Sequence, residues 1–194
     1  MRSGKKFTAG FLSTLLCLMV MLLSACGSSG QVKGQKASAD KQVYVLPEDA
    51  VPDIATFDPG LSTDLASIQA IDMVFTGLVQ LDDKAAVRPQ LASSWDLAPD
   101  GLTWTFHLRP NLKFSDGTPL TSADVAYSID RALQPAEHSV VGPTYLALVK
   151  DSDQLVAGKI KTVINDSLLT PDANTIIIKA NKKAAYFLDA LTYS

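Results

Sequence analysis

Few residues of this chain have the types and the spacing that catalysis or metal binding requires. Its two histidines, His107 and His138, lie far apart, and no cysteine stands near either of them. A zinc site needs three or four ligands, and an activated nucleophile needs a base beside it, so neither histidine predicts such a centre. Neither a glycine-rich phosphate loop nor the G-x-S-x-G turn of hydrolases occurs in the sequence. We therefore expect a protein that is not an enzyme and that needs no metal and no cofactor.

Two Asp-Gly pairs and two tryptophans could be taken for site residues, but structural roles explain them better. The pairs at 100–101 and 116–117 are typical turn residues, and the oxygen-ligand spacing of a calcium loop is missing around them. Trp95 and Trp104 lie in predicted strands, where a large aromatic ring is usually part of the core. His107 is expected to be a half-exposed residue of the same strand pair.

Residues 1–25 have the pattern of a secretory leader. Arg2, Lys5 and Lys6 supply positive charge, an uncharged apolar run follows at 11–23, and small residues come directly before Cys26. The apolar run is shorter than the roughly 20 residues that a membrane-spanning helix needs. The alternative is a short membrane anchor that stays attached.

Cys26 is predicted to be chemically modified. Leu23, Ser24, Ala25 and Cys26 together resemble a bacterial lipobox, in which the cysteine becomes the new N-terminus and carries lipid. Two or more acyl chains hold a protein stably on a membrane. An unpaired thiol or half of a disulfide is the alternative, but Cys17 lies within the leader and would be lost on cleavage. Residues 26–41 are then predicted to form a flexible tether to an extracytoplasmic membrane face.

Charge sets limits on the partners. All acidic residues follow the leader, whereas Arg2, Lys5 and Lys6 lie within it, so cleavage would change the net charge from −3 to −6. A mildly acidic protein without a basic stripe is not expected to bind nucleic acid. We expect a monomer.

Residues 92–130 are the best-defined stretch and must organise the fold. Period-2 alternation from 102 to 109 places Leu, Trp, Phe and Leu on one face, which predicts a strand with one buried side, paired with a strand at 94–97. Tight turns are expected at both Asp-Gly pairs. Thr121 and Asp124 match the capping-box pattern of a helix start, and Pro135 is expected to end that helix.

The remaining elements have weaker signals. A helix over about 64–75 is expected to be capped by Ser62 or Thr63 and to end near Gly77 in a left-handed position. The other expected elements are a strand at 41–46, a loop at 47–59, a hairpin at 78–88, a bend at 89–92, a helix at 144–155, a strand at 159–164, a strand at 174–179 after a turn at 171–172, and a helix at 183–191.

Five segments carry a resemblance to a known family. They are TFDP at 56–59, FTGLV at 75–79, PQLASSW at 89–95, DGLTWTFHLRP at 100–110 and FSDGTPLTSADV at 114–125. In this order they closely resemble the extracytoplasmic solute-binding proteins, family 5, of oligopeptide and dipeptide ABC transporters. The resemblance covers about residues 43–194.

The resemblance implies an α/β fold, mixed α+β, of the type II periplasmic-binding-protein kind. Such proteins have two lobes that close on a solute and pass it to a membrane permease. Family members are more than twice as long, so we expect residues 42–75 to begin the first lobe and residues 76–194 to form a subdomain inserted in it. The second lobe, with the acidic residue that usually pairs with a peptide's amino group, is expected to be absent.

The expected function is that of a lipid-anchored, peptide-binding subunit of an ABC importer, poorly competent for ligand by itself. The alternatives are a binder of another solute, such as nickel or a sugar, and a surface lipoprotein that acts as an interaction or sensing module. By their place after the motif at 56–59, the segment at 62–65 and then the segment at 142–145 are expected to line the cleft. The candidate ligand residues are Ser62, Thr63, Asp64, Leu65, Gly142 and Tyr145. Helix capping and surface loops are the alternative roles of these residues.

Overall fold

The computed structural model describes residue 38 and residues 53–193 of the 194-residue chain. The predicted leader, Cys26, most of the tether and the strand expected at 41–46 lie outside the described residues. Residues 53–193 belong to one compact unit that spans 48–194. No helix in the described part of the chain combines the length and the apolar character needed to cross a membrane.

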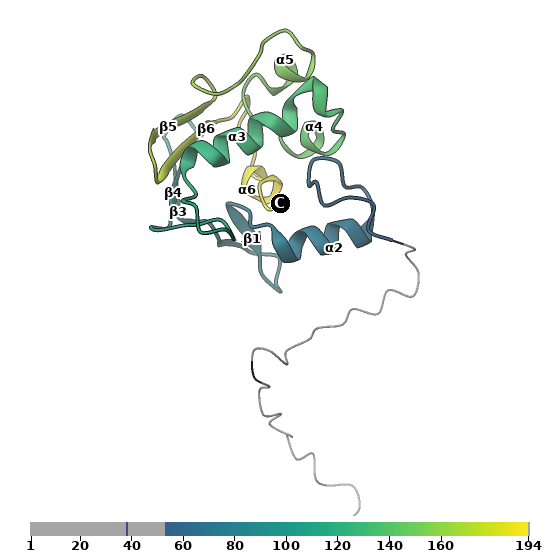
Figure 1. The fold of residues 1–194 in the computed structure, drawn as a ribbon. Helices are drawn as coiled ribbons and strands as arrows, with labels where there is room; N and C mark the ends of the chain where they lie inside the picture. Colours follow the sequence, from purple (N-terminus) through teal and green to yellow (C-terminus); the bar gives the residue numbers. More distant parts are fainter. Residues whose placement is uncertain (1–37, 39–52, 194) are drawn as a thin grey trace, which may run out of the picture. The chain divides into compact units, whose positions relative to one another are not determined.

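A four-stranded antiparallel sheet is the framework of this unit (Figure 1). Its strands are β3 (Ala92–Leu97), β4 (Thr103–Leu108), β5 (Leu168–Asp172) and β6 (Thr175–Lys179), in the spatial order β3-β4-β6-β5. The β3–β4 and β5–β6 pairs are hairpins, and the central β4–β6 pair joins segments that are far apart in the sequence. The chain between the two hairpins therefore has to leave the sheet and return to it.

The predicted β3–β4 hairpin is confirmed, together with its turn. Asp100 accepts hydrogen bonds from the amides of Leu102 (2.7 Å) and Thr103 (2.9 Å), and Gly101 has a φ of +69°, which glycine adopts without strain. Phe106 and Leu108 are buried on the inner face, as the alternation predicted. Trp104 packs partly buried against the core and stacks on Phe187, with ring centroids 5.2 Å apart.

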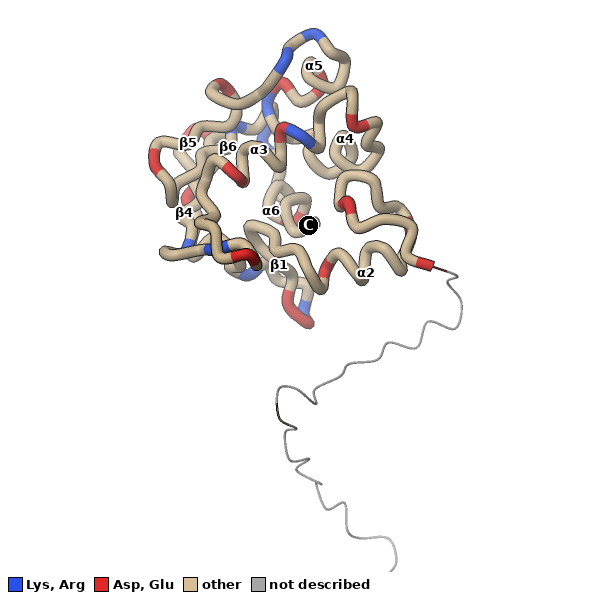
Figure 2. The backbone as a smooth tube through the Cα atoms, viewed as in Figure 1, with Lys and Arg blue, Asp and Glu red and all other residues tan. Residues whose placement is uncertain are grey.

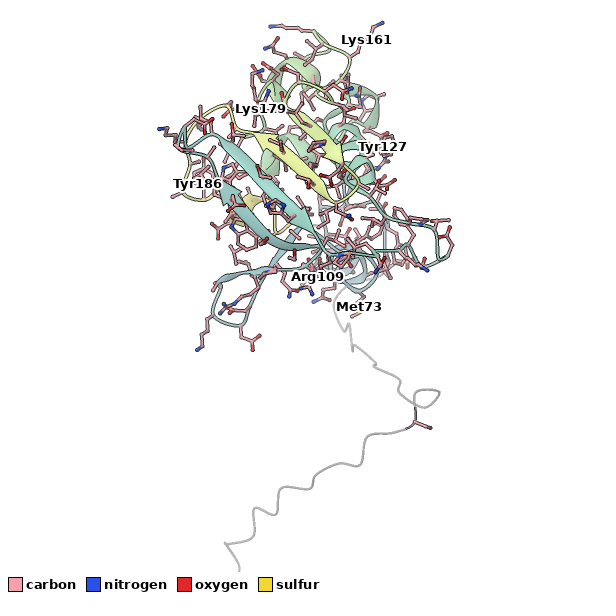
Figure 3. All side chains as sticks on the ribbon, turned by 90° about the vertical axis from the view of Figure 1, so that its left-hand side faces the viewer. Met73, Arg109, Tyr127, Lys161, Lys179 and Tyr186 are labelled. Atoms are coloured by element: carbon pink, nitrogen blue, oxygen red, sulfur yellow. The ribbon has the colours of Figure 1, made fainter. Side chains whose placement is uncertain are left out.

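Helix α3 (Ser122–Leu133) covers the inner face of the sheet (Figure 1). The predicted capping box is present, because the Thr121 amide donates to the Asp124 carboxylate at 2.7 Å. Figure 3 views the sheet from its outer face, with the helices behind it and Lys179 on the near side. The fully buried core residues from the sheet and the helices include Phe106, Leu133, Leu155, Leu168, Ile176, Ile178 and Phe187.

At the N-terminal end of the described unit, α2 (Leu65–Val74) precedes a small hairpin of β1 (Val79–Leu81) and β2 (Val87–Pro89). The helix and the hairpin were both predicted. Two details were wrong: Asp64, not Ser62 or Thr63, caps the helix, and Gly77 has no left-handed conformation. The helix ends at Val74, close to the predicted end at 75, and Phe75 follows it with an extended backbone.

The continuous helix expected at 144–155 is wrong, because the chain forms two short helices there. They are α4 (Val141–Tyr145) and α5 (Ser152–Val156), preceded by the 3-10 turn η2 (Pro135–Glu137). Between them Val149 forms a bridge with Ala180, and the Lys150 amide donates to the Lys179 carbonyl at 2.8 Å. Hydrogen bonding to the end of β6 therefore interrupts the helix.

The strand expected at 159–164 is also wrong, and β5 was missed. Asp130 of α3 accepts the Val163 amide at 2.8 Å, and Ile164 forms only an isolated bridge, with Leu168, so this segment is bound to the helix and forms no strand of its own. Pro171, assigned to a turn, lies within β5, an edge strand where a missing amide is tolerated. The helix expected at 183–191 is shorter, α6 (Phe187–Ala190).

Asp130 should be the buried polar residue on which the α3 packing depends most. It is 7% exposed, and its carboxylate accepts from Thr162 Oγ1 (2.7 Å), the Val163 amide and Gln134 Nε2 (2.7 Å). We expect Asp130→Ala to lower the free energy of unfolding by about 3 kcal/mol, because a buried amide loses its partner. Urea unfolding followed by circular dichroism measures this. A loss no larger than that of the exposed control Asp153→Ala would contradict the prediction.

Candidate functional site

The loop that precedes α2 is fastened to the last turn of α3 by an ion pair. Both Asp58 carboxylate oxygens accept from Arg131, at 3.2 Å and 2.5 Å, and Arg131 also donates to Glu137 at 2.7 Å. This bidentate geometry is the strong form of an arginine–carboxylate contact. The hydrogen bonds from Arg131 lower the pKa of Asp58, although burial acts in the opposite direction. The same hydrogen bonds raise the pKa of Arg131.

A second fastening joins the same loop to α4. Ser139 Oγ donates to the Gly60 carbonyl at 2.5 Å and accepts from the Gly142 amide at 2.8 Å. Gly142 itself is buried where α4 meets α3, and a Cβ added there would lie 2.0 Å from the Ala132 carbonyl oxygen. Only glycine permits this approach, so Gly142 has a packing role whether or not it meets a ligand.

The segment at 62–65 leaves this fastened loop and starts α2. Asp64 caps the helix by accepting the Ser67 amide at 2.8 Å, which lowers its pKa. The Ser67 hydroxyl in turn accepts from the Ala55 and Thr56 amides at 3.0 and 3.2 Å, which closes the loop. Ser62 is completely buried, Thr63 is exposed and Leu65 is 62% exposed.

Tyr193 connects the two segments that the sequence proposed as ligand-binding. Its ring stacks on Tyr145 with centroids 4.1 Å apart and planes 12° from parallel, and its hydroxyl donates to the Ser62 carbonyl at 3.2 Å. Burial, then the neighbouring Tyr145 and Asp72, raise the pKa of the Tyr193 hydroxyl. A neutral hydroxyl is the form that can donate this bond.

Charge is spread evenly over the rest of the described unit. Figure 2 shows lysine and arginine interspersed with aspartate and glutamate, without one large region of a single sign. Within residues 53–193, no group of three or more histidine, cysteine, aspartate or glutamate side chains is placed to hold a metal ion. His107 lies on the outer face of β4 and contacts Asp96 at 3.1 Å.

Comparison with known proteins decides the family. The sequence model of the bacterial extracellular solute-binding proteins, family 5 Middle, matches residues 86–194. The chain belongs to this family. The resemblance stated from the motifs is thereby confirmed.

Curated members of family 5 align over most of the chain. The periplasmic murein peptide-binding protein MppA of Escherichia coli (strain K12) is 30% identical over 178 residues, which are 91% of this chain and 32% of MppA. A dipeptide-binding protein of Lactococcus lactis subsp. cremoris is 34% identical over 149 residues, 76% of this chain and 25% of that protein. The chain thus spans about a third or less of the length of these relatives.

Solved family 5 structures confirm the predicted type II-like α/β fold. The unliganded open form of MppA superposes with a TM-score of 0.65 and 31% identity, over 72% of this chain and 27% of that one. OppA of Haemophilus influenzae in complex with RPPGFSPFR superposes with a TM-score of 0.65 and 27% identity, over 71% of this chain and 27% of OppA.

In this family 5 chain, the structure brings Ser62 and Tyr145 together through Tyr193. It leaves Thr63 and Leu65 exposed beside them and places Gly142 in the core. The sequence did not identify the residues that join these segments, which are Arg131, Ser139 and Tyr193. The sequence favoured a solvated role for Asp58 in its loop, whereas the structure pairs it with Arg131.

Replacing Asp58 should change how stability depends on pH. The folded state lowers the pKa of Asp58, so the ion pair stabilises the fold above the ordinary aspartate pKa, and this contribution is lost as pH falls through the folded value. We expect Asp58→Asn to be less stable than the parent at pH of about 7, with the gap closing below about pH 4. Urea unfolding of both proteins over this range measures the gap.

The exposed control Asp83→Asn should show no such gap at any pH. The other aspartates with lowered pKa are present in both proteins, so the difference isolates Asp58. A gap that stays constant with pH would show that the ion pair is not its origin.

Proposed function

We propose that this chain forms part of the peptide-contacting lobe of a solute-binding subunit that serves an ABC importer. The observation that carries the proposal is the contact of Tyr193 with both Ser62 and Tyr145, in a chain whose relatives include proteins named for binding peptides. The two segments are far apart in the sequence, and Tyr193 contacts both of them. The exposed side chains of Thr63, Leu65 and Tyr145 near this contact support a common purpose.

The chemistry of this surface suits an extended peptide. Thr63 is exposed, and within residues 53–193 neither its amide nor its carbonyl has a hydrogen-bond partner. Free main-chain groups of this kind can pair with a peptide backbone as a neighbouring strand does, whatever the peptide's side chains are. Leu65 and the 40%-exposed Tyr145 flank this main chain with apolar surface. The peptide side chains would contact these two residues.

The proposal includes a place for the protein in the cell. Cys26 would carry lipid and hold the chain, as a monomer, on the extracytoplasmic face of the membrane. Residues 26–41 would leave the folded unit free to move near a permease. The name of the family, extracellular solute-binding proteins, supports this location.

Lipid attachment can be tested directly. Cells that express the chain should incorporate a labelled fatty acid into it, and Cys26→Ser should abolish the label and release the protein from the membrane fraction. Cys17→Ser serves as the matched control and should keep both the fatty-acid label and the association with the membrane fraction. Label that survives Cys26→Ser would refute the anchor.

Peptide contact can be tested at Thr63 by nuclear magnetic resonance. Titration of the 194-residue chain with tri-alanine should shift the signals of residues 63–65 and 145, with a Kd of about 1 mM or weaker. Thr63→Pro removes the amide donor and should abolish the shifts. Thr63→Ala keeps the amide and should retain them.

Two results would contradict this picture. Equal shifts in Thr63→Pro and Thr63→Ala would exclude main-chain pairing at Thr63. Nanomolar affinity of the 194-residue chain by calorimetry would show that a second lobe is not needed.

A further inference from the structure

A groove of about 280 Å³, lined in part by Tyr145, lies between the α4–α5 region and the connection from β6 to α6. It involves no residue of the loop at 53–65. Its lining comes from three segments, with Thr144, Tyr145, Ala147 and Leu148 in the first, Asn181 and Lys182 in the second, and Tyr186 and Ala190 in the third.

Two tyrosine side chains line this groove and are open to solvent. Tyr145 is 40% exposed and Tyr186 is 55% exposed, whereas Leu148 is buried. The ring of Tyr145 is held in place by its stack on Tyr193. Figure 3 shows Tyr186 at the margin of the unit, away from Tyr127 and Arg109. An exposed aromatic ring with a fixed position, such as that of Tyr145, contacts a second ring at a low entropic cost.

The groove is preformed, because hydrogen bonds join its walls. The Asn181 amide donates to the Leu148 carbonyl at 2.9 Å, and Asn181 Nδ2 donates to the Ala147 carbonyl at 2.7 Å. These bonds join the chain after α4 to the chain after β6. A ligand would not have to order the groove before it binds.

The charge of the lining is positive. Lys182 is its one ionic residue, and no carboxylate belongs to it. Among the described residues, Lys182 forms no ion pair. The adjacent Lys183 extends elsewhere, since its Cε lies 3.0 Å from the position of a Cβ on Gly101, near Asp100.

We propose that this groove binds a small group that contains both an aromatic ring and a carboxylate, as a phenylalanine with a free carboxylate does. The ring would pack against Tyr145 and Tyr186, and the carboxylate would accept a hydrogen bond from the Lys182 ammonium. The volume of about 280 Å³ is just below the range for small-molecule sites, which is about 300–1,000 Å³, so one such group fits and a long peptide does not. The ligand is either a free aromatic acid or the C-terminal residue of a peptide. The proposal does not depend on peptide pairing at Thr63.

The test is a nuclear magnetic resonance titration of the 194-residue chain with N-acetyl-L-phenylalanine. We expect saturable shifts at residues 144–148 and 181–190, with a Kd of about 1 to 10 mM. The uncharged N-acetyl-L-phenylalanine amide should bind about threefold more weakly, the effect of one exposed ion pair. N-acetylglycine, which has no ring, should produce no saturable shift.

Lys182→Gln should make the acid and the amide bind equally, while the matched control Lys183→Gln should leave their difference unchanged. Gly-Gly-Phe then distinguishes the two sources. Affinity equal to that of N-acetyl-L-phenylalanine indicates a peptide C-terminus, and markedly weaker affinity indicates a free acid. The proposal is overturned if the acid and the amide bind equally to the parent chain, if Lys183→Gln acts like Lys182→Gln, or if no saturable shift appears at these residues.

Discussion

The pairing of β4 with β6 is the constraint on which the rest of the described unit depends. Each strand has a hairpin partner that is close in sequence. The β4–β6 pairing, in contrast, closes a loop of residues 109–174, and closing this loop costs conformational entropy. Phe106, Ile176 and Ile178, which are completely buried along this pair, supply the compensating burial of apolar surface. Once the pair forms, α3 is confined to the inner face of the sheet.

The last turn of α3 then serves as the reference point for the candidate site. Arg131 holds Asp58, and the backbone of Ala132 meets Gly142 at a distance that excludes any side chain. The loop before α2 and the start of α4 are therefore both positioned against two consecutive residues of one helix. Tyr193 closes the arrangement by joining Ser62 to Tyr145. The site is thus built from contacts between segments that the sheet brings together.

This dependence explains which features the sequence could predict. The Asp100 turn, the Thr121 capping box and the alternation along β4 are local, because the residues that determine each lie within a few positions of one another. The family motif pointed to 62–65 and 142–145 without identifying their contacts. Arg131, Ser139 and Tyr193 meet partners 73, 79 and 131 positions away, and no local pattern encodes such a meeting. Strand β5 was missed for the same reason, since only its place at the sheet edge makes Pro171 acceptable.

The exposed surface around Thr63 and Tyr145 can bind a peptide only weakly, because it covers the peptide from one side. Small-molecule sites usually bury 70–90% or more of a ligand, whereas a peptide lying on this surface would be covered from one side only. The loss of translational and rotational freedom on association is the same in both cases, so contacts on one side have to offset all of it. A surface of this kind can set the register of a bound main chain, but it retains a ligand weakly. Strong retention requires a second surface that covers the ligand from the opposite side, and exposed apolar residues such as Leu65 would gain most from being covered.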